Sequence, residues 1–158
     1  SVYADYDKTK QAVLSLKSYI DAQPKSIQLC HIDAVPDNFL FVTGKDGSEE
    51  IKLTDWEYAG MQDPHLDVAM FIIYAMYDRD SAEKLIDLYF SDGCDKATRL
   101  KIYCYIAVSG LVWSNWCEFK RHCGVEFGAY AQRQYDYARE YTKIFFKEYR
   151  EAFGRDYV

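Results

Sequence analysis

The chain lacks the features that mark several large classes of protein. No apolar run approaches the ~20 residues that a membrane-spanning helix needs, and residues 1–10 are polar, without the core of a signal peptide. Basic residues form no stripe, and the formal net charge is −6, so nucleic acid is not an expected partner. We therefore expect a cytoplasmic protein that does not insert into membranes.

Paired cysteine motifs are also missing. The chain has five cysteines and no CxxC sequence; this odd count argues against a disulfide framework and suits a reducing compartment. Cys117, His122 and Cys123 lie close together in the sequence, but no second ligand pair with the spacing of a zinc site accompanies them. We expect neither disulfides nor zinc.

Aromatic residues are plentiful. They make up 17% of the 158 residues, and fifteen of them are tyrosines. A tyrosine ring favours burial while its hydroxyl still needs a partner, so we expect a core with polar seams or a pocket lined with rings. The length fits one compact domain, residues 1–158.

Apolar periodicity and turn residues predict a mostly helical α+β domain with one small hairpin. We expect helices over 5–22, 63–77, 81–90, 97–122 and 129–152, with Asp63 and Ser81 as caps. Short strands are expected over 27–30, 39–42 and 51–53, and the turn at 44–47 joins the last two. Residues 31–38 and 55–62 are expected to be polar loops.

These two loops carry the residues of chemical interest. The first places Asp33 five positions before Asn38, and the second begins at Asp55. Phosphoryl transfer from ATP needs an acceptor for the proton of the attacking hydroxyl and oxygen ligands for Mg²⁺. The hairpin brings both loops to the same end of its strands, so Asp33 as base and Asn38 and Asp55 as metal ligands would form a workable site. The alternative is that Asp and Asn simply favour loops.

The spacing His31-x-Asp33-x-x-x-x-Asn38, followed by Thr54-Asp55-Trp56-Glu57, resembles the catalytic and metal loops of protein-kinase-like phosphotransferases. This superfamily includes aminoglycoside phosphotransferases and choline/ethanolamine kinases. The resemblance implies the C-terminal lobe of the protein-kinase-like fold, with helices around the hairpin that carries both loops. It implies that Asp33 is the catalytic base and that Asn38 and Asp55 bind Mg²⁺.

Three further residues gain expected roles from the same resemblance. Glu57 is a second-tier candidate for the metal site. His31 and Asp67 are expected to support the loops. Asp67 lies near a helix start, where a negative charge is favourable.

A second motif lies in the C-terminal half. Trp113 and Trp116 share a helix face, which is usually a sign of core. However, Leu111–Trp116 together with Tyr130-Ala131-Gln132 resembles the C-terminal part of choline kinases, in which such rings form a box around the choline headgroup. Ring faces suit a quaternary ammonium, which has no N–H to donate. The resemblance implies a box of Trp113, Trp116 and Tyr130.

One departure from the family pattern concerns the helix after the second loop. Animal-type choline kinases carry an acidic residue there, and this chain has the apolar stretch Phe71-Ile72-Ile73-Tyr74 instead. We expect Tyr74 or Tyr77 to form that wall, as in a bacterial-type choline kinase.

The resemblance extends from about residue 28 to 149 and includes no glycine-rich phosphate loop, strand lysine or glutamate partner. We therefore expect that the N-terminal lobe covering ATP is absent and that this chain alone is inactive. The expected activity is transfer of the γ-phosphate of ATP to choline. The alternatives are another small amino-alcohol, an amino-sugar or an aminoglycoside as acceptor, or a non-catalytic binding domain.

Overall fold

The computed structural model describes residues 2–157. The helices are α1 (Tyr6–Ser15), α2 (Lys17–Ala22), α3 (His65–Tyr74), α4 (Arg79–Tyr89), α5 (Lys96–His122) and α6 (Ala129–Phe153). The strands are β1 (Gln28–Cys30), β2 (Phe39–Thr43), β3 (Glu49–Leu53) and β4 (Gly60–Gln62), with short 3₁₀ turns at Pro36–Asn38 and Trp56–Tyr58. No helix within residues 2–157 is long and apolar enough to cross a membrane.

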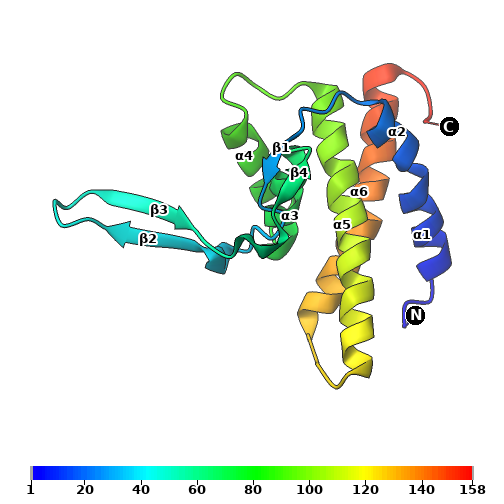
Figure 1. The fold of residues 1–158 in the computed structure, drawn as a ribbon. Helices are drawn as coiled ribbons and strands as arrows, with labels where there is room; N and C mark the ends of the chain where they lie inside the picture. Colours follow the sequence, from blue (N-terminus) through cyan, green and yellow to red (C-terminus); the bar gives the residue numbers. More distant parts are fainter. Residues whose placement is uncertain (1, 158) are drawn as a thin grey trace.

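Two long helices form the centre of the helical body (Figure 1). α5 and α6 lie side by side, α3 packs on α5, and α1 lies against both long helices. The long helices approach each other closely at Gly110 of α5. A Cβ atom at this position would lie only 2.7 Å from the carbonyl oxygen of Gln134 and 2.8 Å from the Cβ of Tyr137. Glycine therefore allows the two helix backbones to touch.

Tyrosines fill much of the core, and the hydroxyls of several of them form polar seams. The largest fully buried side chains include Tyr103, Tyr135, Tyr137 and Tyr141. The Tyr137 hydroxyl donates to the carbonyl of Tyr77 at 2.6 Å, and the Tyr135 hydroxyl donates to Asp5 at 2.9 Å. These bonds satisfy polar atoms that burial would otherwise leave without partners.

The first predicted helix is divided in two. α1 ends at Ser15 and α2 begins at Lys17. The backbone N–H of the buried Leu16 bonds to the carbonyl three residues earlier, that of Val13, and the Ser15 hydroxyl bonds back to the carbonyl of Ala12. Such local bonds tighten and bend a helix, which explains the break that apolar periodicity did not predict.

Three predicted helix boundaries were wrong. α3 begins at His65 with Pro64, and not Asp63, at the capping position, although Asp63 Oδ1 accepts a hydrogen bond from the His65 backbone N–H at 3.2 Å. Asp78, and not Ser81, caps α4 by accepting a hydrogen bond from the Ser81 backbone N–H at 2.9 Å; an aspartate preceding the helix outcompetes a serine inside its first turn. α3 ends at Tyr74, earlier than expected, and the left-handed backbone of Met76 (φ 51°) follows.

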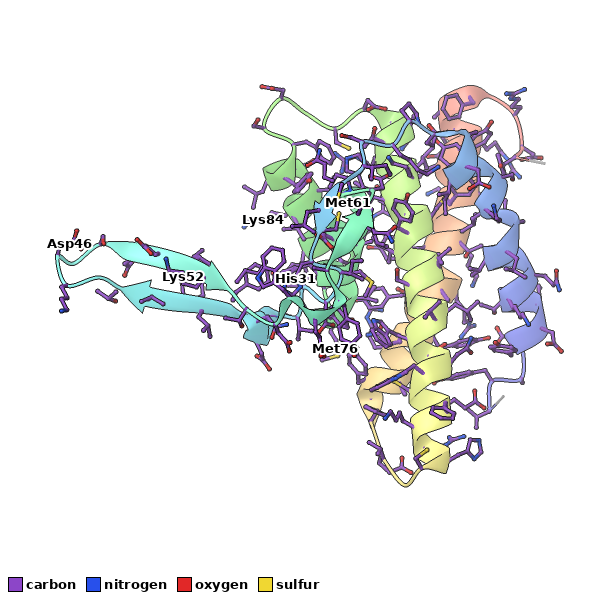
Figure 2. All side chains as sticks on the ribbon, in the orientation of Figure 1. His31, Asp46, Lys52, Met61, Met76 and Lys84 are labelled. Carbon is purple, nitrogen blue, oxygen red and sulfur yellow. The ribbon has the colours of Figure 1, made fainter. Side chains whose placement is uncertain are left out.

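Two small antiparallel ribbons complete the fold. The predicted hairpin is confirmed: β2 pairs with β3 from Phe39↔Leu53 to Thr43↔Glu49. It projects away from the helices, with Asp46 at its tip (Figures 1 and 2). The second ribbon pairs β1 with β4, with Cys30 opposite Gly60. Residues 60–62 were predicted to be loop, and their pairing brings the two polar loops together.

Candidate active site

A cavity of about 620 Å³ opens where the two polar loops meet α3, α5 and α6. It brings together six residues that the sequence indicated, and adds five others. The lining residues are Ile32, Asp33, Val35, Glu57, Tyr58, Met70, Tyr74, Trp113, Trp116, Phe127 and Tyr130. The chain segments that supply them are far apart in sequence, so the fold itself creates the cavity.

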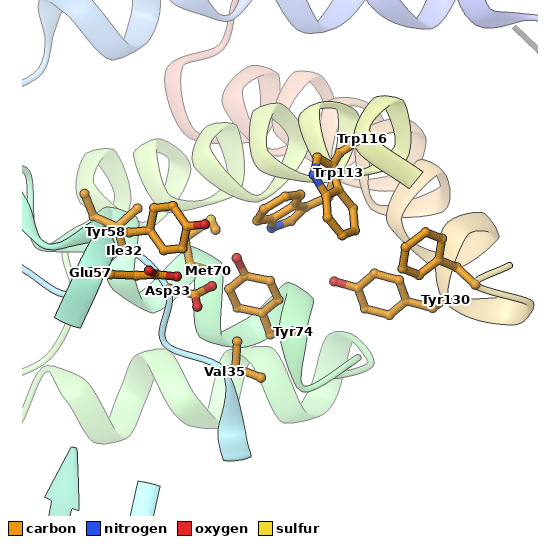
Figure 3. A pocket seen from close by; sticks show the side chains of 11 residues that line it. Ile32, Asp33, Val35, Glu57, Tyr58, Met70, Tyr74, Trp113, Trp116 and Tyr130 are labelled. Carbon is orange, nitrogen blue, oxygen red and sulfur yellow. The ribbon is translucent and has the colours of Figure 1, made fainter. Parts of the chain in front are cut away.

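The cavity has an acidic end and an aromatic end (Figure 3). The carboxylates of Asp33 and Glu57 lie at one end, Tyr130 lies at the other, and Tyr74 stands between them. Burial raises the pKa of the Tyr74 hydroxyl, and its hydrogen bond to Asp33 raises this pKa further. The Tyr74 hydroxyl therefore stays protonated and can donate to the Asp33 carboxylate.

Asp67 of α3 fixes the backbone of the loop that carries Asp33. Its carboxylate accepts hydrogen bonds from the backbone N–H groups of His31 at 2.9 Å and Ile32 at 2.8 Å. Ile32 has a left-handed backbone (φ 69°), which is a strained conformation for a β-branched residue. Two charge-assisted bonds offset this strain, so Asp67 determines the direction in which Asp33 leaves the strand.

His31 links the first loop to the second. Its ring is buried and its Nε2 atom lies 2.7 Å from the carbonyl oxygen of Thr54. The edge of the His31 ring also contacts Trp56, with ring centroids 4.8 Å apart. The structure thus gives His31 a place as a bridge between the loops, outside the cavity lining.

Asn38 and Asp55 lie beside the cavity and do not line it. The Nδ2 group of Asn38 donates to the carbonyl of Asp33 at 3.0 Å, which leaves its Oδ1 atom available as a ligand. The backbone N–H of Thr54 donates to the carbonyl of Asn38 at 3.0 Å. Because Asp55 is the next residue after Thr54, this bond keeps Asp55 near Asn38. Asp55 is exposed and has a left-handed backbone (φ 62°), which turns it away from the line of β3.

The side-chain oxygens of Asn38 and Asp55 suit Mg²⁺, which is rarely held by protein ligands alone. Among residues 2–157, no group of three or more His, Cys, Asp or Glu side chains could hold a metal ion. Mg²⁺ is commonly bound through one or two side-chain oxygens, with water and substrate phosphates completing its shell. An amide oxygen from Asn38 and a carboxylate from Asp55 fit that requirement.

The rings at the aromatic end form a continuous series. Trp113 and Trp116 have centroids 5.2 Å apart, and Trp116 lies 5.1 Å from Phe127. Phe127 is 6.3 Å from Tyr130, and Tyr74 is 5.6 Å from Trp113. The sequence pattern did not assign Phe127 to the site, although this residue lies between the two segments that resemble the choline box.

Tyr77 lies outside the lining. Its ring contacts Phe71, with centroids 5.8 Å apart, and its carbonyl accepts hydrogen bonds from Arg133 and Tyr137. Because α3 ends at Tyr74, the next residues turn away from the cavity. Of the two tyrosines expected at this wall, the structure places Tyr74 there.

Comparison with known proteins indicates the family of this chain. The choline/ethanolamine kinase family model matches residues 1–92. Protein LicA of Haemophilus influenzae is 30% identical over 121 residues, which cover 69% of this chain and 41% of LicA. The solved choline kinase LicA from Streptococcus pneumoniae is 29% identical with a TM-score of 0.70, over 90% of this chain and 49% of that one. A LicA structure in complex with AMP is 28% identical with a TM-score of 0.71, over 91% of this chain and 48% of that one.

The chain thus spans about half the length, or less, of the relatives that it matches. Its fold is the C-terminal lobe of the protein-kinase-like fold, in which helices surround the hairpin that carries both site loops. By the match to the family model and by these structural neighbours, the chain belongs to the choline/ethanolamine kinase family.

Proposed function

We propose that this chain is the acceptor-binding and metal-binding lobe of a kinase that transfers the γ-phosphate of ATP to the hydroxyl of choline. The observation that carries the proposal is the cavity in which Asp33 faces a series of aromatic rings. Family membership supports phosphotransfer, and the solved relatives include a choline kinase and an AMP complex.

The geometry suggests how an acceptor would lie. A quaternary ammonium group would rest among Trp113, Trp116 and Tyr130, where each ring face contributes ~0.5–2 kcal/mol. The hydroxyl of choline would then reach Asp33 at the acidic end. As the hydroxyl oxygen forms its bond to the γ-phosphorus, Asp33 accepts the proton, and the bond to the β–γ bridging oxygen breaks to release ADP.

The metal ligands in this proposal are Asn38 Oδ1 and the Asp55 carboxylate. Mg²⁺ bound there would offset the charge of the ATP phosphates. Glu57, whose carboxylate lies at the acidic end of the cavity, remains the second-tier metal candidate. His31 and Asp67 act through the backbone of the loops.

We further propose that residues 1–158 are a single domain and that an N-terminal lobe covering ATP is its partner in the full-length protein. Relatives about twice as long support this division. On this proposal the lobe alone has no turnover, and the full-length protein acts in the cytoplasm, where Mg·ATP is available.

The assignment of Asp33 is tested by replacing it in the full-length protein. Asp33→Asn should lower kcat for choline phosphorylation by about 10²- to 10⁴-fold, the usual contribution of a general base. Asp37→Asn is the matched control, because Asp37 lies in the same loop but does not line the cavity. Turnover like that of the wild type in Asp33→Asn would contradict the assignment.

The acceptor is tested with this chain alone, by tryptophan fluorescence. Choline should change the emission, and Trp116→Ala should weaken its binding by about 2- to 30-fold, as the loss of one cation–π contact predicts. The uncharged isostere 3,3-dimethylbutan-1-ol should bind more weakly than choline. A response to an aminoglycoside with none to choline would favour the alternative acceptor.

A further inference from the structure

A buried ion pair lies on the side of α5 that faces away from the solvent. Lys101 is only 2% exposed, and its Nζ atom donates to Asp63 Oδ2 at 2.6 Å and to the carbonyl oxygen of Pro24 at 2.8 Å. The Tyr105 hydroxyl donates to the same Asp63 oxygen at 3.0 Å. Lysine is almost never buried unless it is paired, so the pairing with Asp63 is what allows Lys101 to lie in the interior.

Both partners of Lys101 lie at the end of the β1–β4 ribbon that is far from the cavity. Pro24 precedes β1, and Asp63 directly follows β4. At the other end of the ribbon, β1 continues into the loop that carries Asp33, and β4 is preceded by the loop that carries Asp55. One ammonium group therefore joins the two chain segments from which both site loops extend.

The strand pairing of the ribbon is not enough to hold it in place. It contains three residue pairs, and an isolated two-stranded ribbon is at best marginally stable. The central pair, Leu29 and Met61, is 64% and 62% exposed, and Met61 is visible on β4 in Figure 2. At the cavity end the ribbon is held by Asp67 and by the buried side chains of Cys30 and His31, and at the far end it is held by Lys101.

We propose that Lys101 is a positioning residue that sets the spacing between the catalytic and metal loops. It ties Pro24 to Asp63, and the ribbon transmits that constraint to Asp33 and Asp55. This inference rests on the proposed phosphotransfer function. A displacement of about 1 Å between reacting groups can lower a rate by about 10²-fold, so a loosened ribbon would reduce turnover before it reduced acceptor binding.

The test removes the charge pair as a unit. Lys101→Met alone would leave Asp63 as an uncompensated buried charge and could prevent folding. The double variant Lys101→Met/Asp63→Asn, the clamp variant, avoids this. The amide oxygen introduced at position 63 can still accept from the His65 backbone N–H, which donates to Asp63 Oδ1 at 3.2 Å, and the amide N–H group can donate to the Tyr105 hydroxyl. Pro24 is exposed, so water can replace Lys101 at its carbonyl.

A matched control lies two residues earlier on the same helix. Arg99 pairs with Glu83 of α4 at 2.5 Å, and both side chains are partly buried. Neither residue belongs to the ribbon or to the cavity lining. Arg99→Met/Glu83→Gln therefore removes an ion pair between helices without touching the segments that hold the loops.

In the full-length protein, the clamp variant should lose about 10-fold or more in kcat, with the KM for choline changed less than about twofold because the aromatic rings stay in place. Amide hydrogen exchange should become faster in residues 28–33 and 54–62. The control should lower thermal stability and leave kcat and this exchange unchanged.

Equal kcat and equal exchange in the two double variants would overturn the proposal. The result is separable from the proposed function. If the wild-type protein phosphorylates no alcohol, the proposed function fails, while faster exchange confined to residues 28–33 and 54–62 in the clamp variant still supports the role of Lys101, and unchanged exchange there refutes it.

Discussion

Gly110→Ala should destabilise the protein, although alanine normally favours a helix. A Cβ at position 110 would lie 2.7 Å from the Gln134 carbonyl oxygen and 3.1 Å from the Ala138 backbone nitrogen. These are backbone atoms of α6, so no side chain can rotate to make room. The two long helices must move apart, and overpacking of this kind costs about 1–3 kcal/mol.

The two contributions to the free energy have opposite signs. Alanine gains about 1 kcal/mol over glycine in helix propensity, whereas a clash with backbone calls for the upper part of the overpacking range. The net loss is about 2 kcal/mol, which corresponds to a fall in Tm of about 4–8 °C for a chain of this size. Urea denaturation followed by circular dichroism measures the loss.

The control for this prediction is Asn115→Ala, at an exposed position of the same helix. There alanine gains helix propensity and meets no neighbour, so the unfolding free energy should stay equal or rise by about 0.5 kcal/mol. If Gly110→Ala were as stable as the wild type or more so, the close contact of α5 with α6 at Gly110 would be refuted.

Two further substitutions test the loop anchor Asp67 and the partly buried His65. Asp67→Asn should lower the unfolding free energy by about 2–3 kcal/mol in urea, because two bonds to a charged acceptor, from the N–H groups of His31 and Ile32, are weakened; an unchanged midpoint would contradict that role. Burial, and then Lys101, lower the pKa of His65 below its usual 6.5, so the unfolded state binds more protons and stability is lost as pH falls through and below that value. His65→Phe keeps the ring contacts and should flatten the dependence between pH 7.5 and 5.5, and a slope like that of the wild type would exclude His65 as its source.

The hairpin was predictable because every signal for it is local. The turn Gly44-Lys45-Asp46-Gly47 separates two apolar runs, and antiparallel pairing then follows from chain connectivity. The pairing of β1 with β4 was not predictable in this way. Gln28 and Gln62 are partners, but they are far apart in sequence, and residues 60–62 have no apolar alternation.

The candidate site was also predictable only in part. Asp33, Asn38 and Asp55 were identified from their spacing and Glu57 from the family resemblance. The structure places Asp33 and Glu57 in the cavity lining. Phe127 was missed because it follows the end of α5, where no periodicity assigns a face. Lys101 was missed because a lysine within an apolar helix gives no indication of its partner when that partner, Asp63, lies 38 positions away.

The projecting hairpin also affects how this lobe behaves in solution. Phe41 is 82% exposed and Ile51 is 61% exposed, and within residues 2–157 neither outer edge of the β2–β3 ribbon pairs with another strand. Open edges with apolar side chains are templates for strand addition from a second molecule. The charged residues Glu49, Glu50 and Lys52 on β3 and the net negative charge oppose such aggregation. The colloidal stability of the isolated lobe therefore depends on ionic strength, since salt screens this repulsion while the exposed apolar edge remains.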